Sequence, residues 1–93
     1  MDKIFKYQLQ VEDVQDVEMP IGSTVLTVQA QGPIPCIWAH VSPEARIVKR
    51  RFRTYGTGHP MKDSDSFPFY VGTYQLSGGA LVFHVFTDRV EYT

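Results

Sequence analysis

The stretch that decides the fold is residues 46–55, which read RIVKRRFRTY. Side chains two positions apart lie on the same face of a β-strand, so this stretch divides into two faces of different character. One face would carry Lys49, Arg51, Arg53 and Tyr55, and the other would carry Val48, Arg50, Phe52 and Thr54. The first set suits solvent, and the second is mostly apolar. Residues 46–55 are therefore predicted to form a strand, with Arg50 as the exception on its inner face.

Similar alternation recurs on both sides of this strand. The other predicted strands are residues 4–11, 24–30, 36–41, 69–76 and 80–87, with a weaker one at 14–19. Turn residues between them, at 31–33 and at 77–79, predict two hairpins. No stretch shows a convincing helical period. We therefore expect a single all-β domain over residues 1–93, a small antiparallel barrel or sandwich of six to seven strands with little or no helix.

Two of the predicted strands carry further expectations about their faces. In residues 24–30, one face would hold Leu26, Val28 and Ala30, and the other would hold Val25, Thr27 and Gln29. Residues 80–87 are apolar on both faces, with Leu81, Phe83 and Val85 on one and Val82, His84 and Phe86 on the other. A strand that is apolar on both faces is typical of the interior of a sheet or of a covered layer.

The composition limits the kinds of partner to be expected. Ten acidic and nine basic side chains give a formal net charge of −1, so the chain exerts no strong long-range attraction on nucleic acids or anionic membranes. Cys36 is the one cysteine, which excludes an internal disulfide and fits a reducing compartment. No apolar run approaches the ~20 residues that span a bilayer. We expect a cytoplasmic protein.

The strongest candidate for a binding site is the stretch Tyr55-Gly56-Thr57-Gly58-His59-Pro60. Glycines let the backbone approach a ligand closely and let successive N–H groups form an anion-binding nest. Thr57 offers a hydroxyl, His59 an imidazole and Tyr55 a stacking surface. Arg51 and Arg53 lead into the loop on one strand face, and guanidinium groups match phosphate oxygens. The predicted ligand-binding residues are therefore Arg51, Arg53, Tyr55, Gly56, Thr57, Gly58 and His59, for a nucleotide-like or phosphorylated small molecule.

Other chemistries are less well supported by the sequence. The three histidines, His40, His59 and His84, lack the ligand spacing of a metal site, so no metal, cofactor or catalytic residue is assigned. His84 is expected to be a packed histidine with one hydrogen bond. Single-stranded nucleic acid could stack on Trp38, Tyr70 and Tyr74 beside the arginines, but the net negative charge makes nucleic acid an unfavoured partner.

Several stretches together resemble a known family. They are Ile4-Phe5-Lys6-Tyr7, Glu18-Met19-Pro20, Pro35-Cys36-Ile37-Trp38-Ala39, the YGTGHP motif at 55–60, Val71-Gly72-Thr73-Tyr74-Gln75 and Gly78-Gly79-Ala80-Leu81-Val82-Phe83-His84-Val85-Phe86. This pattern resembles small, uncharacterised proteins of tailed phages and prophages, over nearly the whole chain. That family has no assigned activity, so the resemblance implies context alone: a phage protein in the cytoplasm of its bacterial host.

Three functions remain open at this point. The first is a non-enzymatic, phage-associated binding protein that counters host defence by sequestering a nucleotide or another phosphorylated ligand, with the site at an interface of a homo-oligomer. The second is a protein–protein inhibitor of a host bacterial factor, acting through a sheet edge or an aromatic patch. The third is a small enzyme acting on a phosphorylated substrate. We expect the first, because the sequence offers a binding loop without an acid, base and nucleophile set.

Overall fold

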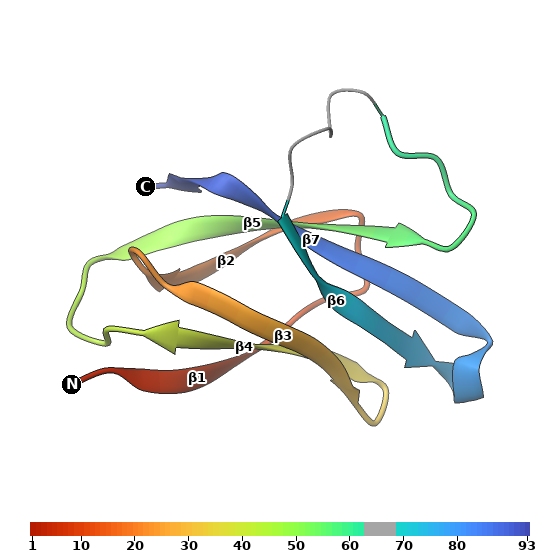
Figure 1. Cartoon of the computed structure of the whole chain (residues 1–93), viewed down its shortest axis with the longest axis horizontal. Helices are drawn as coiled ribbons and strands as arrows, with labels where there is room; N and C mark the ends of the chain where they lie inside the picture. Colours follow the sequence, from red (N-terminus) through yellow and green to blue (C-terminus); the bar gives the residue numbers. More distant parts are fainter. Residues whose placement is uncertain (63–68) are drawn as a thin grey trace.

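Extended backbone dominates the computed structural model, which describes residues 1–62 and 69–93 (Figure 1). The described residues form the strands β1 (Lys3–Gln8), β2 (Val14–Pro20), β3 (Thr24–Gln31), β4 (Ile34–Val41), β5 (Ile47–Gly56), β6 (Phe69–Leu76) and β7 (Leu81–Tyr92). One short 3₁₀ turn, η2 (Ser77–Gly79), links β6 to β7. The expected all-β fold with little helix is confirmed, although β7 continues well past the predicted end at residue 87. The described part of the chain contains no helix with the length and hydropathy needed to cross a membrane.

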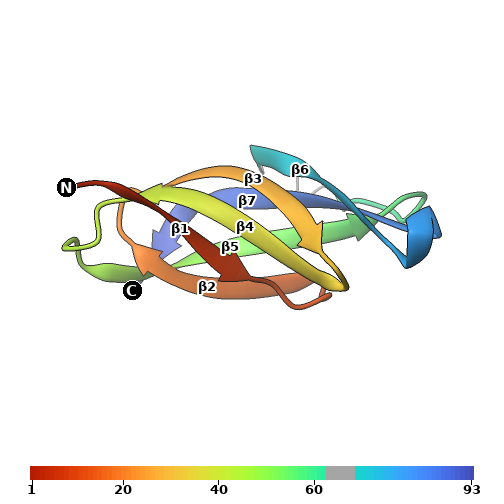
Figure 2. The same cartoon turned by 90° about the horizontal axis from the view of Figure 1, so that it is seen from below.

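Two antiparallel sheets make up the fold. The three-stranded sheet has the order β1-β4-β3, and the four-stranded sheet has the order β2-β5-β7-β6. Figure 2 shows the two sheets stacked as layers, with β1, β4 and β3 across the near face. The structure is therefore the sandwich of the two predicted alternatives, not a closed barrel. Both predicted hairpins, β3–β4 and β6–β7, are present, and β7 is an interior strand as its apolar faces indicated.

The core lies between the sheets, and β5 contributes alternate residues to it. On β5, the side chains of Val48, Arg50, Phe52 and Thr54 are buried, as the alternation predicted. Phe52 belongs to the core cluster, whose other buried members are Leu9, Met19, Val28, Ile37, Tyr74 and Val85. Because β5 pairs with both β2 and β7, its inward residues contact both halves of the four-stranded sheet.

The predicted faces of β3 are wrong at two positions, Val25 and Leu26. A β-bulge shifts the register of β3 against β4 between Val25 and Thr27. The extra residue, Leu26, is 47% exposed, whereas Val25 packs against the core. A bulge places two residues opposite one and so reverses the inward and outward positions on one side of it. Leu26 therefore lies on the outer surface instead of beside Val28 and Ala30.

Arg50 is buried because it has a partner from the far end of the chain. Its Nη2 donates to Glu91 Oε2 on β7 and to the carbonyl oxygen of Ser23, each at 2.9 Å. The backbone N–H of Gly22 donates to the same carboxylate, at 3.1 and 3.2 Å from its two oxygens. The Arg50 and Glu91 side chains are only 11% and 19% exposed. This ion pair therefore fastens the β2–β3 turn to β5 and β7 at one end of the sandwich.

A glycine allows the two sheets to meet along one flank, where β3 and β6 lie side by side. A Cβ atom at Gly72 would lie 2.9 Å from Val28 Cγ1 and 3.6 Å from the Val28 backbone nitrogen. Val28 is fully inside the core, so its side chain has little room to move away. Gly72 thus sets the spacing between β6 and β3.

Removal of one member of the Arg50–Glu91 pair should be costly. Glu91→Ala would leave a buried guanidinium without its counter-ion, and we expect a loss of about 3 kcal/mol in the free energy of unfolding. Urea denaturation measures it. The matched control is Asp16→Ala, which breaks an ion pair whose side chains are 32% and 31% exposed and should cost less than about 1 kcal/mol. Equal losses for the two variants would contradict the structural role given to Arg50.

The close approach of β6 to β3 gives a second prediction. Gly72→Ala should lower the free energy of unfolding by about 1–3 kcal/mol, because the new methyl group overpacks against Val28. In a Val28→Ala background the same change should cost clearly less, since the obstructing methyl groups are gone. Chemical denaturation of the two single variants and the double variant measures this coupling. Strictly additive losses in the free energy of unfolding would show that the methyl group at position 72 does not clash with Val28.

Candidate functional site

The loop after β5 begins with a tight turn. The backbone N–H of His59 donates to the carbonyl oxygen of Gly56 at 3.0 Å, and Gly58 has φ of +85°. This combination is that of a type II turn, which requires positive φ at its third residue and therefore favours glycine there. The backbone N–H of Thr57 also donates to the carbonyl oxygen of Val82 at 3.1 Å, which holds the turn against β7. Residues 57–62 of this loop are exposed.

Gly56 has a different role from Gly58. A Cβ atom at Gly56 would lie 2.9 Å from Nδ1 and 3.0 Å from Cε1 of His59. The imidazole therefore lies against the backbone at the end of β5. A residue with a side chain at position 56 would clash with it there. In this way the sequence Gly-Thr-Gly-His folds the histidine ring back over the strand that precedes it.

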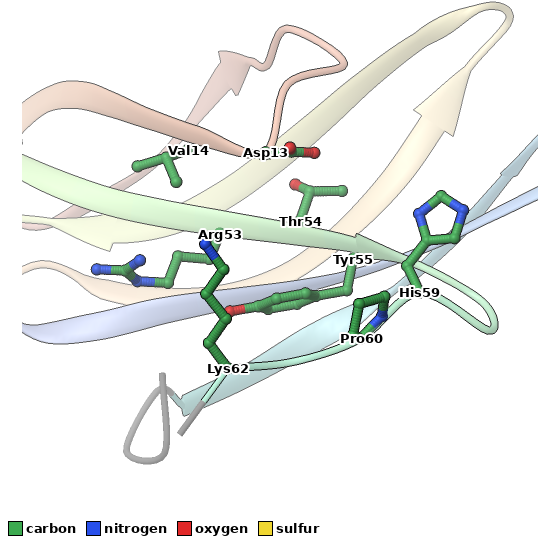
Figure 3. A pocket seen from close by; sticks show the side chains of 8 residues that line it. All are labelled: Asp13, Val14, Arg53, Thr54, Tyr55, His59, Pro60 and Lys62. Carbon is green, nitrogen blue, oxygen red and sulfur yellow. The ribbon is translucent and has the colours of Figure 1, made fainter. Parts of the chain in front are cut away.

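The first hollow at this loop, which we call the cationic hollow, has a volume of about 490 Å³. Its lining residues are Asp13, Val14, Arg53, Thr54, Tyr55, His59, Pro60 and Lys62 (Figure 3). It lies beside the start of β2, at the end of β5 that extends beyond the pairing of these two strands. Arg53 and Lys62 lie on one side of β5, and Asp13 and Thr54 lie on the other. The volume falls in the usual range of small-molecule sites.

Thr54 is an unusual member of this lining. Its side chain is buried, and its Oγ1 has no hydrogen-bond partner among the described residues. Buried hydroxyl groups nearly always find a partner in folded proteins, so Thr54 is an exception; its Oγ1 is closed off from solvent and does not itself face the hollow. Nothing in the sequence pattern distinguishes Thr54, because it is one of the alternating inward residues of β5.

A second, smaller hollow of about 230 Å³ lies beside the first, and we call it the aromatic hollow. Its lining residues are Tyr55, Gly56, Thr57, Gly58, His59, Met61, Tyr70, His84 and Phe86. The Phe86 ring makes edge contacts with Tyr55 and Tyr70, with centroids 5.7 and 5.4 Å apart. Since Tyr55 and His59 line both hollows, the two form one continuous candidate site at the end of β5, beside the loop that follows it.

A chain of hydrogen bonds borders the aromatic hollow. His84 Nε2 lies 2.7 Å from Thr57 Oγ1, and His84 Nδ1 lies 2.9 Å from Thr73 Oγ1. The Tyr70 hydroxyl continues the chain, 2.6 Å from the same Thr73 oxygen. His84 thus has two hydrogen-bonding partners instead of the one expected, and its ring lies half-buried on the outer face. The prediction of a simply packed histidine was wrong, because its partners come from β6 and from the loop after β5.

The two arginines of the predicted site are both held by carboxylates. Arg51 binds Asp16 of the neighbouring strand with two hydrogen bonds, at 2.9 and 3.2 Å, and its guanidinium lies 4.6 Å from the ring centre of Tyr92. The hydrogen bonds from Arg51 lower the pKa of the Asp16 carboxyl, and the same pairing raises the pKa of Arg51. Arg53 binds Asp88 in the same two-pronged way, at 3.0 and 3.3 Å. The positive charges of Arg51 and Arg53 are therefore each balanced by a carboxylate from a neighbouring strand.

The structure brings most of the predicted site residues together. Those that line at least one hollow are Arg53, Tyr55, Gly56, Thr57, Gly58 and His59. Arg51 lines neither hollow and belongs to the ion pair with Asp16. The lining residues that were not identified as site members from the sequence include Asp13, Thr54, Lys62, Tyr70, His84 and Phe86. Only the fold places them there, since they lie on three strands and two loops.

The remaining candidates are placed elsewhere. Tyr74 lies in the core, where burial raises the pKa of its phenol, so it cannot serve as a stacking surface beside Tyr70. His40 pairs with Asp2 at 2.9 Å, and the Cys36 thiol is buried near Gln31. Within residues 1–62 and 69–93, no three metal-ligating side chains come together.

The contact between Gly56 and His59 is open to a direct test. Gly56→Ala should displace the imidazole and shift the NMR signals of the His59 ring, while the free energy of unfolding changes by less than about 1 kcal/mol, because the ring is at the surface. The control is Gly58→Ala, where a Cβ meets nothing within 4 Å but the positive φ costs about 1–2 kcal/mol. Unchanged His59 signals in Gly56→Ala would contradict this packing.

Comparison with known proteins gives a family but no function. Neither the curated proteins nor the solved structures contain a match to this chain. One family model matches residues 1–93. The chain therefore belongs to the family described as a domain of unknown function, DUF7352.

Proposed function

We propose that the protein is a binding module for a small phosphorylated ligand, which it holds in the cationic hollow without chemical conversion. The observation that carries this proposal is the hollow of about 490 Å³ that Arg53, Tyr55, His59 and Lys62 line together. A site of this kind combines a concave shape with a few convergent polar groups and an aromatic surface.

The charges of the hollow suggest how such a ligand would lie. Lys62 is exposed and brings an ammonium group, which attracts phosphate as a compact charge. Arg53 adds a guanidinium whose plane is fixed by Asp88, so its orientation is set before a ligand arrives. The Asp13 carboxylate lies across β5 and would repel phosphate. It would instead accept hydrogen bonds from hydroxyl groups. Phosphate would therefore bind at the Lys62 side, and a polyol such as a sugar at the Asp13 side.

The biological setting is part of the same proposal. The resemblance to small proteins of tailed phages would place the chain in the cytoplasm of a bacterial host. There, a protein that binds a phosphorylated signal without converting it would act by lowering the concentration of that signal. Sequestration needs only affinity and abundance, and this is compatible with a site that offers binding groups without a matched acid, base and nucleophile.

Lys62→Gln should weaken the binding of ribose 5-phosphate about tenfold, which corresponds to about 1.4 kcal/mol, because the variant loses a charge-assisted contact to phosphate. Isothermal titration calorimetry measures this at constant ionic strength. Lys49→Gln is the matched control: it removes the same charge from an exposed position outside both hollows and should leave the affinity unchanged. Absence of heat with the wild-type protein, or an equal effect of the two variants, would refute the proposed function.

A further inference from the structure

We propose that the aromatic hollow is a separate recognition subsite for a planar nitrogen heterocycle, so that the complete ligand is a nucleotide. The part of this inference that concerns phosphate rests on the proposed function, whereas the part that concerns the ring stands on the aromatic hollow alone. At about 230 Å³ the hollow is below the usual size of a whole small-molecule site, which fits a subsite for one ring.

The walls of the hollow suit a flat aromatic ring. Phe86 is held edge-on between Tyr55 and Tyr70, so these three rings are fixed relative to one another before any ligand binds. Tyr70 is 60% exposed although it is one of the largest side chains of the sheet. Exposed aromatic faces beside a hollow are the usual platforms on which nucleic-acid bases stack.

The hydrogen-bond chain gives this subsite a polar edge. A neutral imidazole donates from one nitrogen and accepts at the other, so the chain through His84 can run in two directions. When Nε2–H donates to Thr57, Nδ1 accepts from Thr73, and Thr73 accepts from the Tyr70 hydroxyl, whose oxygen can then accept from a ligand. In the reverse direction, Thr73 donates to the Tyr70 oxygen, whose O–H can then donate to a ligand.

Because the hydrogen-bond chain can run in either direction, the subsite would favour a heterocyclic base over a plain hydrocarbon ring. Ring nitrogens, carbonyl oxygens and exocyclic amino groups of bases present acceptors and donors side by side. A phenol whose hydroxyl can accept or donate, depending on the imidazole tautomer, meets either kind of group. A hydrocarbon ring would use the stacking surface alone and gain nothing from the Tyr70 hydroxyl, Thr73 or His84.

The position of the subsite connects it to the cationic hollow. Tyr55 and His59 line both hollows, so a ligand that extends past these two residues would occupy both. The base would lie on the aromatic side and the phosphate would lie on the Lys62 side. The tight turn at Thr57-Gly58 forms part of the wall of the aromatic hollow and supplies one end of the hydrogen-bond chain.

Calorimetry of the full chain with three probes tests the inference: ribose 5-phosphate, adenosine and adenosine 5′-monophosphate. We expect adenosine 5′-monophosphate to bind the wild-type protein at least tenfold more tightly than ribose 5-phosphate. Tyr70→Ala should remove this advantage and leave the affinity for ribose 5-phosphate unchanged. Tyr70→Phe, which keeps the stacking surface, should lose only part of it. Tyr92→Phe is the control, since Tyr92 borders neither hollow.

The outcomes separate the two proposals. If ribose 5-phosphate binds and the base adds no affinity, or if Tyr70→Ala keeps the advantage, the inference about the aromatic hollow is overturned and the proposed function stands. If adenosine binds in a Tyr70-dependent manner while phosphate adds nothing, the ring subsite is supported and the phosphate site is not. No binding of any probe would overturn both. Thermal denaturation of each variant shows whether a lost affinity reflects lost folding.

Discussion

The alternation of side chains along β5 is the constraint on which the rest of the molecule depends. Its inward residues enter the core between the sheets, and one of them is an arginine. A guanidinium can remain there only with a buried counter-charge, which Glu91 of β7 supplies. The same alternation places Arg53 and Tyr55 on the outer face, so one strand determines both the packing of the sandwich and the orientation of the candidate site.

Much of the fold could be predicted because strand faces are a local property. The period of two in residues 46–55 correctly identified the buried side of β5, and turn residues identified both hairpins. The position of Leu26 could not be predicted, because a bulge depends on how β3 pairs with β4. Arg51 shows the same limit for the site. Its partner Asp16 is 35 residues away in the sequence, so this ion pair could not be predicted from the residues of β5.

The candidate site shows how a small β-sandwich can hold a ligand without a deep interior cleft. Both hollows lie at the end of β5, and the turn after this strand supplies the wall that a flat sheet lacks. Gly56 and Gly58 serve this wall in different ways, since one accommodates the His59 ring and the other permits the positive φ of the turn. His84, Thr73 and Tyr70 come from the sheet itself, so that half of the site is as rigid as the fold.

The contact at Gly72 has a consequence for assembly. Edge strands with unpaired backbone groups invite strand addition from other chains, and a molecule open on two opposite flanks can extend into fibres. Along the flank where β6 meets β3, each strand obstructs the approach of a foreign strand to the other. The remaining sheet edges, β1 and β2, face the opposite flank. Backbone pairing with another chain is therefore left to one flank of the molecule, the one that β1 and β2 form.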